Sequence, residues 1–279
     1  MAGTLYLCAT PIGNLGDITV RVIEILKSVD IIAAEDTRNT LKLLNHFEIK
    51  TPMTSYHQHN MDTKGPVLIE KLKDGKNIAL VTDAGMPGIS DPGEDMAKRC
   101  RQEGIPVTIA PGASAGISAL VLSGMDARRY IFEGFLPTDK NERQTVLKNL
   151  EKETRTTVFY EAPHRLTDTL GVLLKAAGDR EASTVREITK RYEEVKHGTL
   201  GSLLEYYKEN PPKGEFVVIV GGMSESVLRQ EEIDGWNSIS VEEHMKKYTD
   251  EGMSEKEAMK KVAKDRGVSK REIYAYLNR

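Results

Sequence analysis

Four stretches in the first half of the chain place polar and flexible residues directly after a short apolar run. They are residues 10–17, 35–38, 82–93 and 111–116, and each is rich in Gly, Pro, Asp or Thr. Glycine in particular allows a backbone to come close to a ligand. Ligands of open α/β sheets bind beyond the carboxyl ends of parallel strands. If the apolar runs are such strands, the four stretches form one composite pocket.

The stretch from Asp83 to Gly93 is the most unusual, because three glycines and two prolines stand within it. A plain connection between a strand and a helix is usually shorter, so we interpret this loop as functional. The loop has no Lys or Arg, the first stretch lacks the G-x-G-x-x-G spacing, and the chain has no Walker loop. These features argue against a dinucleotide or a nucleoside triphosphate. They favour backbone contacts to a polar cofactor, with carboxylates near its hydroxyls or a positive centre.

Acid–base chemistry could come from Asp36, His57 or Glu161, which stand at or near predicted strand ends. Asp36 has an alternative role as the N-cap of a helix, and the residues around Glu161 could likewise cap the helix that follows. His57 and His59 stand two positions apart. Because no third ligand occurs at a suitable spacing, we expect polar substrate contact there and no metal site.

Apolar residues at helical spacing follow most of the polar stretches, so strands and helices alternate along the first half. Strands that are apolar nearly throughout are typical of a parallel sheet with helices on both faces. The pattern breaks after Gly124, and the second half mixes strand directions more. We therefore predict an N-terminal α/β domain over residues 1–124 and a second α/β domain over 125–223.

The last part of the chain differs from both α/β halves. Residues 223–238 are polar, and we interpret them as a linker. Residues 239–279 are predicted to be helical, because Ser-x-x-Glu capping boxes begin at Ser240 and Ser254. The turn at Gly267 resembles that of a helix-turn-helix. A small helical cap on the second domain is the alternative interpretation.

Bulk composition excludes few classes. The chain has 279 residues and a net charge of −3, which does not indicate nucleic-acid binding, although a local basic surface could provide it. Two cysteines, Cys8 and Cys100, form no disulfide framework and fit a reducing compartment. We see no signal peptide and no apolar run of about 20 residues. We expect a soluble, cytoplasmic protein.

In this order, the motifs closely resemble those of the small-subunit ribosomal RNA methyltransferase I family, within the tetrapyrrole methylase superfamily. The matching segments are TPIGNLGDIT, AAEDTR, SYHQHN, VTDAGMPGISDPG, PGASA, FEGFLP, FYEAPHRL and GEFVVIVGG. The combination is specific, although no single motif is. The resemblance implies an α/β fold with two domains of the class III methyltransferase type, a cleft between them, and a small helical C-terminal domain.

The resemblance also implies an activity: S-adenosylmethionine-dependent methylation of the ribose 2′-hydroxyl of a cytidine in the decoding region of 16S ribosomal RNA. The substrate would be an assembled or assembling 30S particle, and the enzyme a homodimer. Two other functions remain open. One is C-methylation of a tetrapyrrole or another small molecule, and the other is a non-catalytic module that binds RNA or the cofactor.

Carried over motif by motif, the resemblance implies cofactor contacts at Pro11, Asp83, Ala84, Gly85, Met86, Ile89, Ser114, Ala115, Tyr160, Glu161, Ala162, Glu215 and Phe216. A ribose hydroxyl is a weak nucleophile and needs a base as it attacks. Asp36 and His57 rank above Glu161 for this role, because the cofactor could occupy Glu161. Arg38 would hold a phosphate or orient the acid.

RNA binding must come from a local basic surface, since the total charge is negative. The tail is the best candidate, with tyrosines 274 and 276 available to stack on bases. Its basic residues are Lys260, Lys261, Lys264, Arg266, Lys270 and Arg271.

Overall fold

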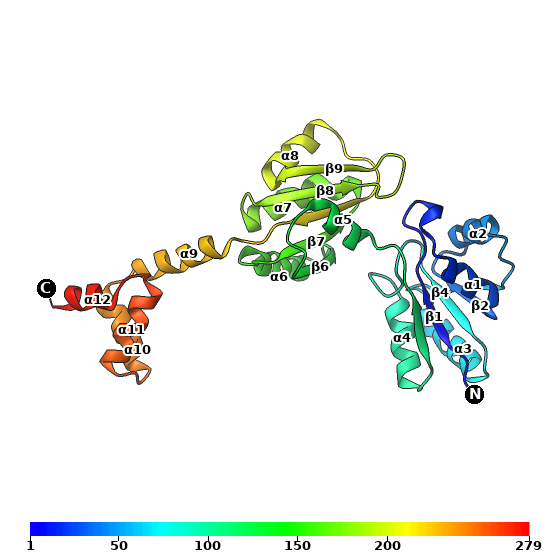
Figure 1. The fold of residues 1–279 in the computed structure, drawn as a ribbon, viewed down its shortest axis with the longest axis horizontal. Coiled ribbons are helices and arrows are strands. Elements are labelled where there is room, and N and C mark those ends of the chain that lie inside the picture. The colour runs from blue at the N-terminus through cyan, green and yellow to red at the C-terminus, as the bar shows by residue number, and fades with distance from the viewer. Residues whose placement is uncertain (279) are drawn as a thin grey trace.

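The computed structural model describes residues 1–278; Arg279, the last residue of the predicted helical extension, lies outside the described residues. The first sheet is fully parallel, and its strand order is β3-β2-β4-β1-β5. The strands are β1 (Leu5–Cys8), β2 (Ile31–Ala34), β3 (Met53–Ser55), β4 (Ile78–Val81) and β5 (Val107–Ala110). The predicted parallel sheet is thus confirmed (Figure 1).

Helices cover both faces of this sheet, as the apolar strands predict. On β4, Ile78 and Leu80 join a core with α3 and α4, while Ala79 and Val81 join a core with α1 and α2. Alternate side chains of a strand point to opposite faces, so an apolar run fills two cores. The helices are α1 (Val20–Ser28), α2 (Thr37–His46), α3 (Met61–Lys73) and α4 (Gly93–Gln102), with a 3-10 turn η1 (Leu15–Asp17).

The second sheet is mixed, with the order β6-β7-β10-β8-β9. β6 runs parallel to β7, and the other pairs are antiparallel. The strands are β6 (Tyr130–Phe135), β7 (Thr156–Glu161), β8 (Glu181–Arg186), β9 (Glu194–Thr199) and β10 (Phe216–Val220). One face carries α6 (Lys140–Glu151), α7 (Leu166–Ala177) and α8 (Leu200–Glu209), and a 3-10 turn η2 (Pro163–Arg165) precedes α7.

The other face of the second sheet is covered by α5 (Ala115–Ser123), which precedes the sheet in the chain. This helix contacts β7, β8, β9 and β10. Its residues Ala119 and Leu120 are buried in the core on that face. Gly124 ends the helix in a left-handed conformation, with φ at +69°. The second layer thus begins before residue 125, and the predicted domain division at 124 stays a prediction.

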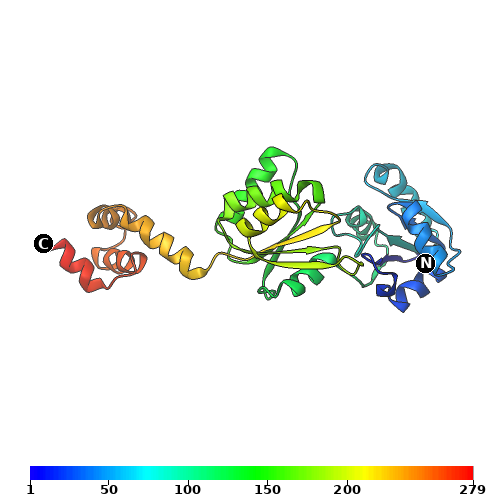
Figure 2. The same ribbon diagram turned by 90° about the horizontal axis from the view of Figure 1, so that it is seen from above.

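The segment predicted as a linker over residues 223–238 is mostly helical, because it forms the helix α9 (Glu225–Asn237), and its role as a linker stays a prediction. Ser224 caps this helix, whose residues are all at least partly exposed. Figures 1 and 2 show α9 leading away from the α/β body to a bundle of three helices. These are α10 (Val241–Asp250), α11 (Glu255–Asp265) and α12 (Lys270–Leu277).

The capping boxes at Ser240 and Ser254 are confirmed, and Ser269 with Glu272 forms a third at the start of α12. The bundle has its own small core, which includes Val262 and Ile273. Among residues 1–278, no helix combines the length and apolar character needed to cross a bilayer.

A buried histidine joins α9 to the bundle. The ring of His244 is fully buried and stacks on Trp236 with ring centroids 4.0 Å apart. Arg266 donates from Nε to His244 Nδ1 at 3.2 Å and from Nη2 to the carbonyls of Ile239 and Ser240. The predicted exposed role of Arg266 in RNA binding is therefore wrong, because this guanidinium is committed to the interior of the tail.

Burial, with the Arg266 charge as the second cause, lowers the pKa of His244 below its usual value of 6.5. Asp265 opposes the shift, and the nearby Lys247 adds to it. The folded tail thus holds a neutral imidazole at a pH where the unfolded chain already binds a proton. Its stability is complete above pH 6.5 and is lost as the pH falls below that value.

We expect the free energy of unfolding of the tail to fall by up to about 1.4 kcal/mol per pH unit below pH 6.5. Trp236 is the only tryptophan of the chain, so denaturant titrations followed by its fluorescence report on this cluster. A His244→Gln protein, measured beside the wild type, should lose most of the slope between pH 6.5 and 5. An equal slope in both proteins would contradict the assignment to His244.

Candidate functional site

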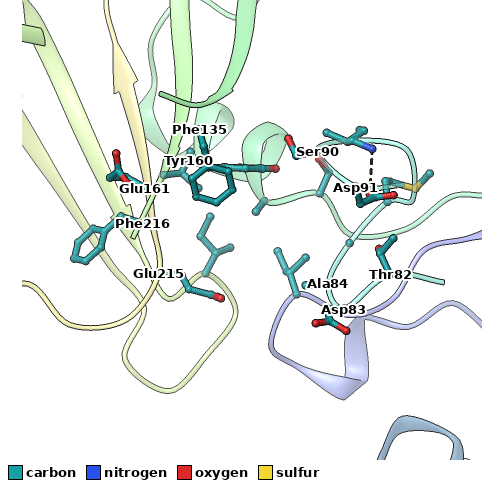
Figure 3. Close-up of a pocket in the computed structure, with 18 of the residues that line it drawn as sticks. Thr82, Asp83, Ala84, Ser90, Asp91, Phe135, Tyr160, Glu161, Glu215 and Phe216 are labelled. Carbon is teal, nitrogen blue, oxygen red and sulfur yellow. Dashed lines mark hydrogen bonds between the residues drawn. The ribbon is translucent and has the colours of Figure 1, made fainter. Parts of the chain in front are cut away.

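The segments that follow four strands of the first sheet, β1, β2, β4 and β5, and residues of the second sheet line a cavity of about 390 Å³ (Figure 3). The loop after β4 and the start of α5 contribute one wall, and the end of β7 and the start of β10 contribute most of the other. All the cofactor residues implied by the sequence line this cavity except Pro11, whose neighbour Ile12 does so instead. The structure thus brings together four sequence motifs that lie far apart in the chain.

The loop between β4 and α4 is organised around one carboxylate. Asp91 accepts hydrogen bonds from the backbone N–H groups of Gly88, Ile89 and Gly93 at 2.8, 3.2 and 2.8 Å. Burial nevertheless raises the pKa of Asp91 from its usual 3.8, against the effect of these bonds. Ser90, beside it, has a left-handed backbone with φ at +65°. Strained, tightly bonded loops of this kind are typical of binding sites.

The same loop is fixed to the first loop of the chain. Thr10 and Gly85 form a two-way backbone bridge, with N–O distances of 2.9 and 3.1 Å. Gly85 has φ at +82°, and a Cβ placed there would lie 3.3 Å from the carbonyl of Ala113. A glycine is needed at this point for both conformation and space.

Aromatic residues make the opposite wall. Tyr160, at the end of β7, packs edge-to-face against Phe132 and Phe135, with centroids 5.1 and 5.6 Å away. Its hydroxyl accepts a hydrogen bond from the N–H of Gly116 at 3.1 Å, and burial raises its pKa above the usual 10. This bond links the second sheet to the start of α5. The wall is apolar and can exclude water from a bound ligand.

Glu161 lines the cavity, but its carboxylate is fully occupied. The side chain has no exposed surface, and it accepts hydrogen bonds from Thr169 Oγ1 at 2.6 Å and from the N–H of Ala162 at 2.8 Å. Arg165 Nε lies 3.5 Å from the carboxylate. These contacts and its burial disfavour Glu161 as a base, a role ranked below those of Asp36 and His57 from the sequence, and the role stays a prediction.

Asp36, ranked with His57 as a candidate base, stands just outside the cavity and caps α2. It accepts hydrogen bonds from the backbone N–H of Arg38 at 2.8 Å and from the guanidinium of Arg38 at 3.1 and 2.6 Å. These bonds lower the pKa of Asp36 to about 2. Both the capping role and the pairing with Arg38 that the sequence suggested are present. A carboxylate with so low a pKa is a weak proton acceptor.

His57 also lies outside the cavity lining. Its backbone N–H donates to Asn60 Oδ1 at 2.9 Å, and its buried Nδ1 has no hydrogen-bond partner among residues 1–278. The ring contacts His59 with centroids 6.0 Å apart. Within the part of the chain that the structure describes, no group of His, Cys, Asp and Glu side chains is arranged to hold a metal ion. The roles of Asp36, Arg38 and His57 toward a ribose stay predictions.

Three charged residues of the cavity were missed as site residues from the sequence: Asp91, described above, Glu35 and Lys190. Glu35 accepts a hydrogen bond from the backbone N–H of Asp83 at 3.3 Å, and Lys190 binds Glu215 at 2.7 Å and Glu187 at 3.0 Å. Glu35 directly precedes the singled-out Asp36, so its position at a strand end was the available signal. Lys190 lies in the β8–β9 loop, and nothing local to that loop indicates its contact with the cavity.

Comparison with known families identifies methylases. The family described as Tetrapyrrole (Corrin/Porphyrin) Methylases matches residues 4–204. Ribosomal RNA small subunit methyltransferase I of Halalkalibacterium halodurans is 50% identical over 272 residues, which are 98% of this chain and 93% of that protein. The Bacillus subtilis protein of the same name is 47% identical with the same coverage. The likeness therefore extends through the C-terminal helices.

Solved structures share the α/β body. Diphthine synthase has a TM-score of 0.61 at 17% identity, covering 79% of this chain and 90% of that one. Cobalt precorrin-4 methyltransferase has a TM-score of 0.58 at 16% identity, covering 78% and 94%. At such identities the likeness concerns the fold alone. The predicted fold class, two α/β layers of the tetrapyrrole methylase type with a helical extension, is confirmed.

Proposed function

This chain belongs to the ribosomal RNA small subunit methyltransferase I family of tetrapyrrole methylases, and from that premise we propose that it methylates 16S ribosomal RNA in the cytoplasm. The methyl donor is S-adenosylmethionine, and the acceptor is the 2′-hydroxyl of a cytidine in the decoding region of the 30S particle. The observation that carries the proposal is the extent of the likeness. It covers 98% of the chain, so it includes the helical tail as well as the methylase body.

The cavity fits a donor that carries a positive charge and no phosphate. Glu35, Asp83 and Glu215 line it with negative charge. Lys190, the cation in its lining, is already paired with two glutamates. Backbone from the loop around Gly85 and the aromatic wall at Tyr160 supply close and apolar contacts. These features suit an adenosyl group and a sulfonium better than a nucleoside triphosphate.

The donor, when bound, would supply a methyl group attached to a good leaving group. The protein's main task is therefore to align this methyl group with the ribose hydroxyl. The loop tied to Asp91 would hold the methionine part, and Tyr160, Ala162 and Phe216 would lie near the adenosine. The apolar wall excludes water that would compete with the ribose hydroxyl.

The direct test is a map of 2′-O-methyl marks in 16S ribosomal RNA from cells with and without this protein. The proposal predicts one cytidine mark in the decoding region that disappears with the gene and returns with the purified protein, 30S particles and donor. An unchanged map together with methylation of a tetrapyrrole by the purified protein would refute it.

The tail is the proposed RNA-holding surface, with a smaller set of basic residues than the sequence indicated. Arg266 is buried, and Lys261 lies 3.7 Å from Asp265, with which it pairs. The remaining lysines and arginine are exposed, as are two tyrosines of α12 that can stack on bases. These residues are Lys260, Lys264, Lys270, Arg271, Tyr274 and Tyr276.

Neutralising this surface should weaken RNA binding and flatten its salt dependence. Each lost phosphate contact reduces the slope of log K against log salt by about 0.7 to 0.9. Filter binding to a decoding-region RNA between 50 and 300 mM salt measures the slope. The variant carries glutamine at Lys260, Lys264, Lys270 and Arg271.

A matched control carries four glutamines on exposed body helices, at Lys42, Lys71, Lys98 and Arg101. It should keep the wild-type slope, and both proteins should bind S-adenosylhomocysteine normally because the cavity lies elsewhere. If the tail variant keeps its slope and affinity, the tail is only a structural cap.

The homodimer is proposed to form through a surface centred on α5, here called the α5 surface. The helix is apolar all round: Ala119 and Leu120 face the second sheet, while Ile117, Val121 and Leu122 are exposed. A helix that is apolar on every side is normally buried. The exposed side continues onto the edge strand β6, because Ile117 lines the same surface hollow as Tyr130 and Phe132.

The helix α5 has no charged residue along its length, so it offers no cation to a phosphate and is better suited to another protein surface. An isologous interface places the same patch on both partners. A second copy of this chain brings an apolar patch of the same extent, which is why we assign the surface to the homodimer.

A further inference from the structure

Five carboxylates line the cavity, and four of them are already committed. The Glu161 side chain is fully buried and accepts hydrogen bonds from Thr169 and Ala162. Asp91 accepts hydrogen bonds from three backbone N–H groups. Asp83 accepts from the N–H of Asp36 and the amide of Asn39. Glu215 is largely exposed and pairs with Lys190. The fifth is Glu35.

Glu35 has one oxygen available. Its Oε2 accepts the hydrogen bond from the backbone N–H of Asp83 at 3.3 Å, and its Oε1 has no partner among residues 1–278. The residue is held at the sheet edge, because its own N–H donates to the carbonyl of Val81 at 3.3 Å. A carboxylate at a strand end, in the lining of a cavity and with one oxygen free of hydrogen bonds, can accept a proton.

The surroundings of Glu35 also make it a stronger base than Asp36. Burial raises the pKa of Glu35 above its usual 4.5, and the charges of Asp83 and Asp91 raise it further. The bond from the Asp83 N–H and the nearby His57 lower it by less. The pKa of Asp36, in contrast, is about 2. A base is more effective the closer its pKa comes to the working pH.

We propose that Glu35 is the catalytic residue that accepts the proton of the target hydroxyl during methyl transfer, an inference that rests on the proposed function. The hydroxyl oxygen forms a bond to the methyl carbon as the carbon–sulfur bond breaks, and the electron pair of that bond stays on sulfur. The hydroxyl proton passes to Glu35 Oε1 and then to water. Positive charge on the donor is thereby removed while one proton is released.

The test is the Glu35→Gln protein in single-turnover methylation of 30S particles. Glutamine retains an oxygen to accept the Asp83 N–H, so the loop keeps its support, but it cannot take a proton at neutral pH. The rate should fall about 10²- to 10⁴-fold, with affinity for S-adenosylhomocysteine by calorimetry within about twofold of the wild type. Glu24→Gln, on the exposed side of α1, is the matched control and should keep the wild-type rate.

A second measurement does not depend on activity. In protein labelled at the glutamate carboxyl carbon, the NMR signals of Glu35 and Glu133 should titrate above the usual value of 4.5, because burial raises the pKa of both carboxyls. Glu35→Gln should remove one of these raised signals. The wild-type rate should fall as the pH drops through the pKa of the removed signal, and the residual rate of the variant should lack this step.

The inference is overturned if Glu35→Gln transfers methyl groups at the wild-type rate. It is also overturned if the variant loses donor affinity as much as rate, or if His57→Gln rather than Glu35→Gln removes the pH step. Failure of the proposed function is a different result: the wild-type protein itself then leaves the 16S RNA unmethylated.

Discussion

A Gly93→Ala protein should bind S-adenosylhomocysteine about a hundredfold more weakly than the wild type while keeping its fold. A Cβ at this position would lie 2.6 Å from the backbone nitrogen of Gly88 and 2.8 Å from Asp91 Oδ1. Neither atom can move without breaking the bonds that Asp91 makes to the loop. Losing two such bonds costs about 2–4 kcal/mol, and 1.4 kcal/mol is a factor of ten in affinity.

Calorimetry measures the affinity, and circular dichroism confirms that the variant is folded. Gly235→Ala is the matched control, because a Cβ at that position in α9 meets no atom within 4 Å. Wild-type affinity in Gly93→Ala would show that the loop between β4 and α4 does not hold the donor.

Val121→Asp should convert the proposed dimer into a monomer. Val121 is 69% exposed at the centre of the α5 surface. In an isologous interface one substitution occurs twice, so two carboxylates would be buried without partners. Each carries a desolvation cost of several kcal/mol. Sedimentation should then give about 31 kDa, the mass of one chain, in place of twice that value.

Val20→Asp provides the control, since Val20 is equally exposed but lies on α1, on the first sheet. It should leave the mass at the dimer value. If the Val121→Asp protein stays dimeric, the interface does not lie on the α5 surface. If the wild-type protein sediments as a monomer, the proposed homodimer is refuted.

Local patterns in the sequence were enough to predict the two α/β layers. β4 is apolar at every position from Ile78 to Val81, and the structure buries all of them between two helical layers. The loop from Asp83 to Gly93 was identifiable because its glycines and prolines have no simpler use. The four polar stretches meet because parallel strands present their carboxyl ends at one sheet edge.

The errors come from residues whose role depends on distant partners. The helix within the segment 223–238 was not predicted from the sequence, because α9 buries no side chain and only the cap at Ser224 indicates a helix locally. The sequence predicts that Arg266 is a surface cation. In the structure its guanidinium donates a hydrogen bond to His244, which lies 22 positions away in the chain. Burial in the folded protein raises the pKa of Glu35, and the charges of Asp83 and Asp91, which are far from it in the chain, raise it further. No periodicity within one segment encodes such contacts.

The helix α9 has a further consequence for how the enzyme would choose its target. Its 13 residues span about 20 Å at 1.5 Å per residue. One end is fixed to the body, where the N–H of Met223 donates to the carbonyl of Glu153, and the other is fixed to the bundle by the Trp236–His244 stack. If the tail holds the RNA as proposed, a stiff helix between tail and body would fix the distance between the bound RNA and the cavity. Only nucleotides at that distance from the tail would then reach the cavity, at a high effective concentration. Distance along the folded ribosomal RNA would then select the nucleotide, in addition to the chemistry of its base.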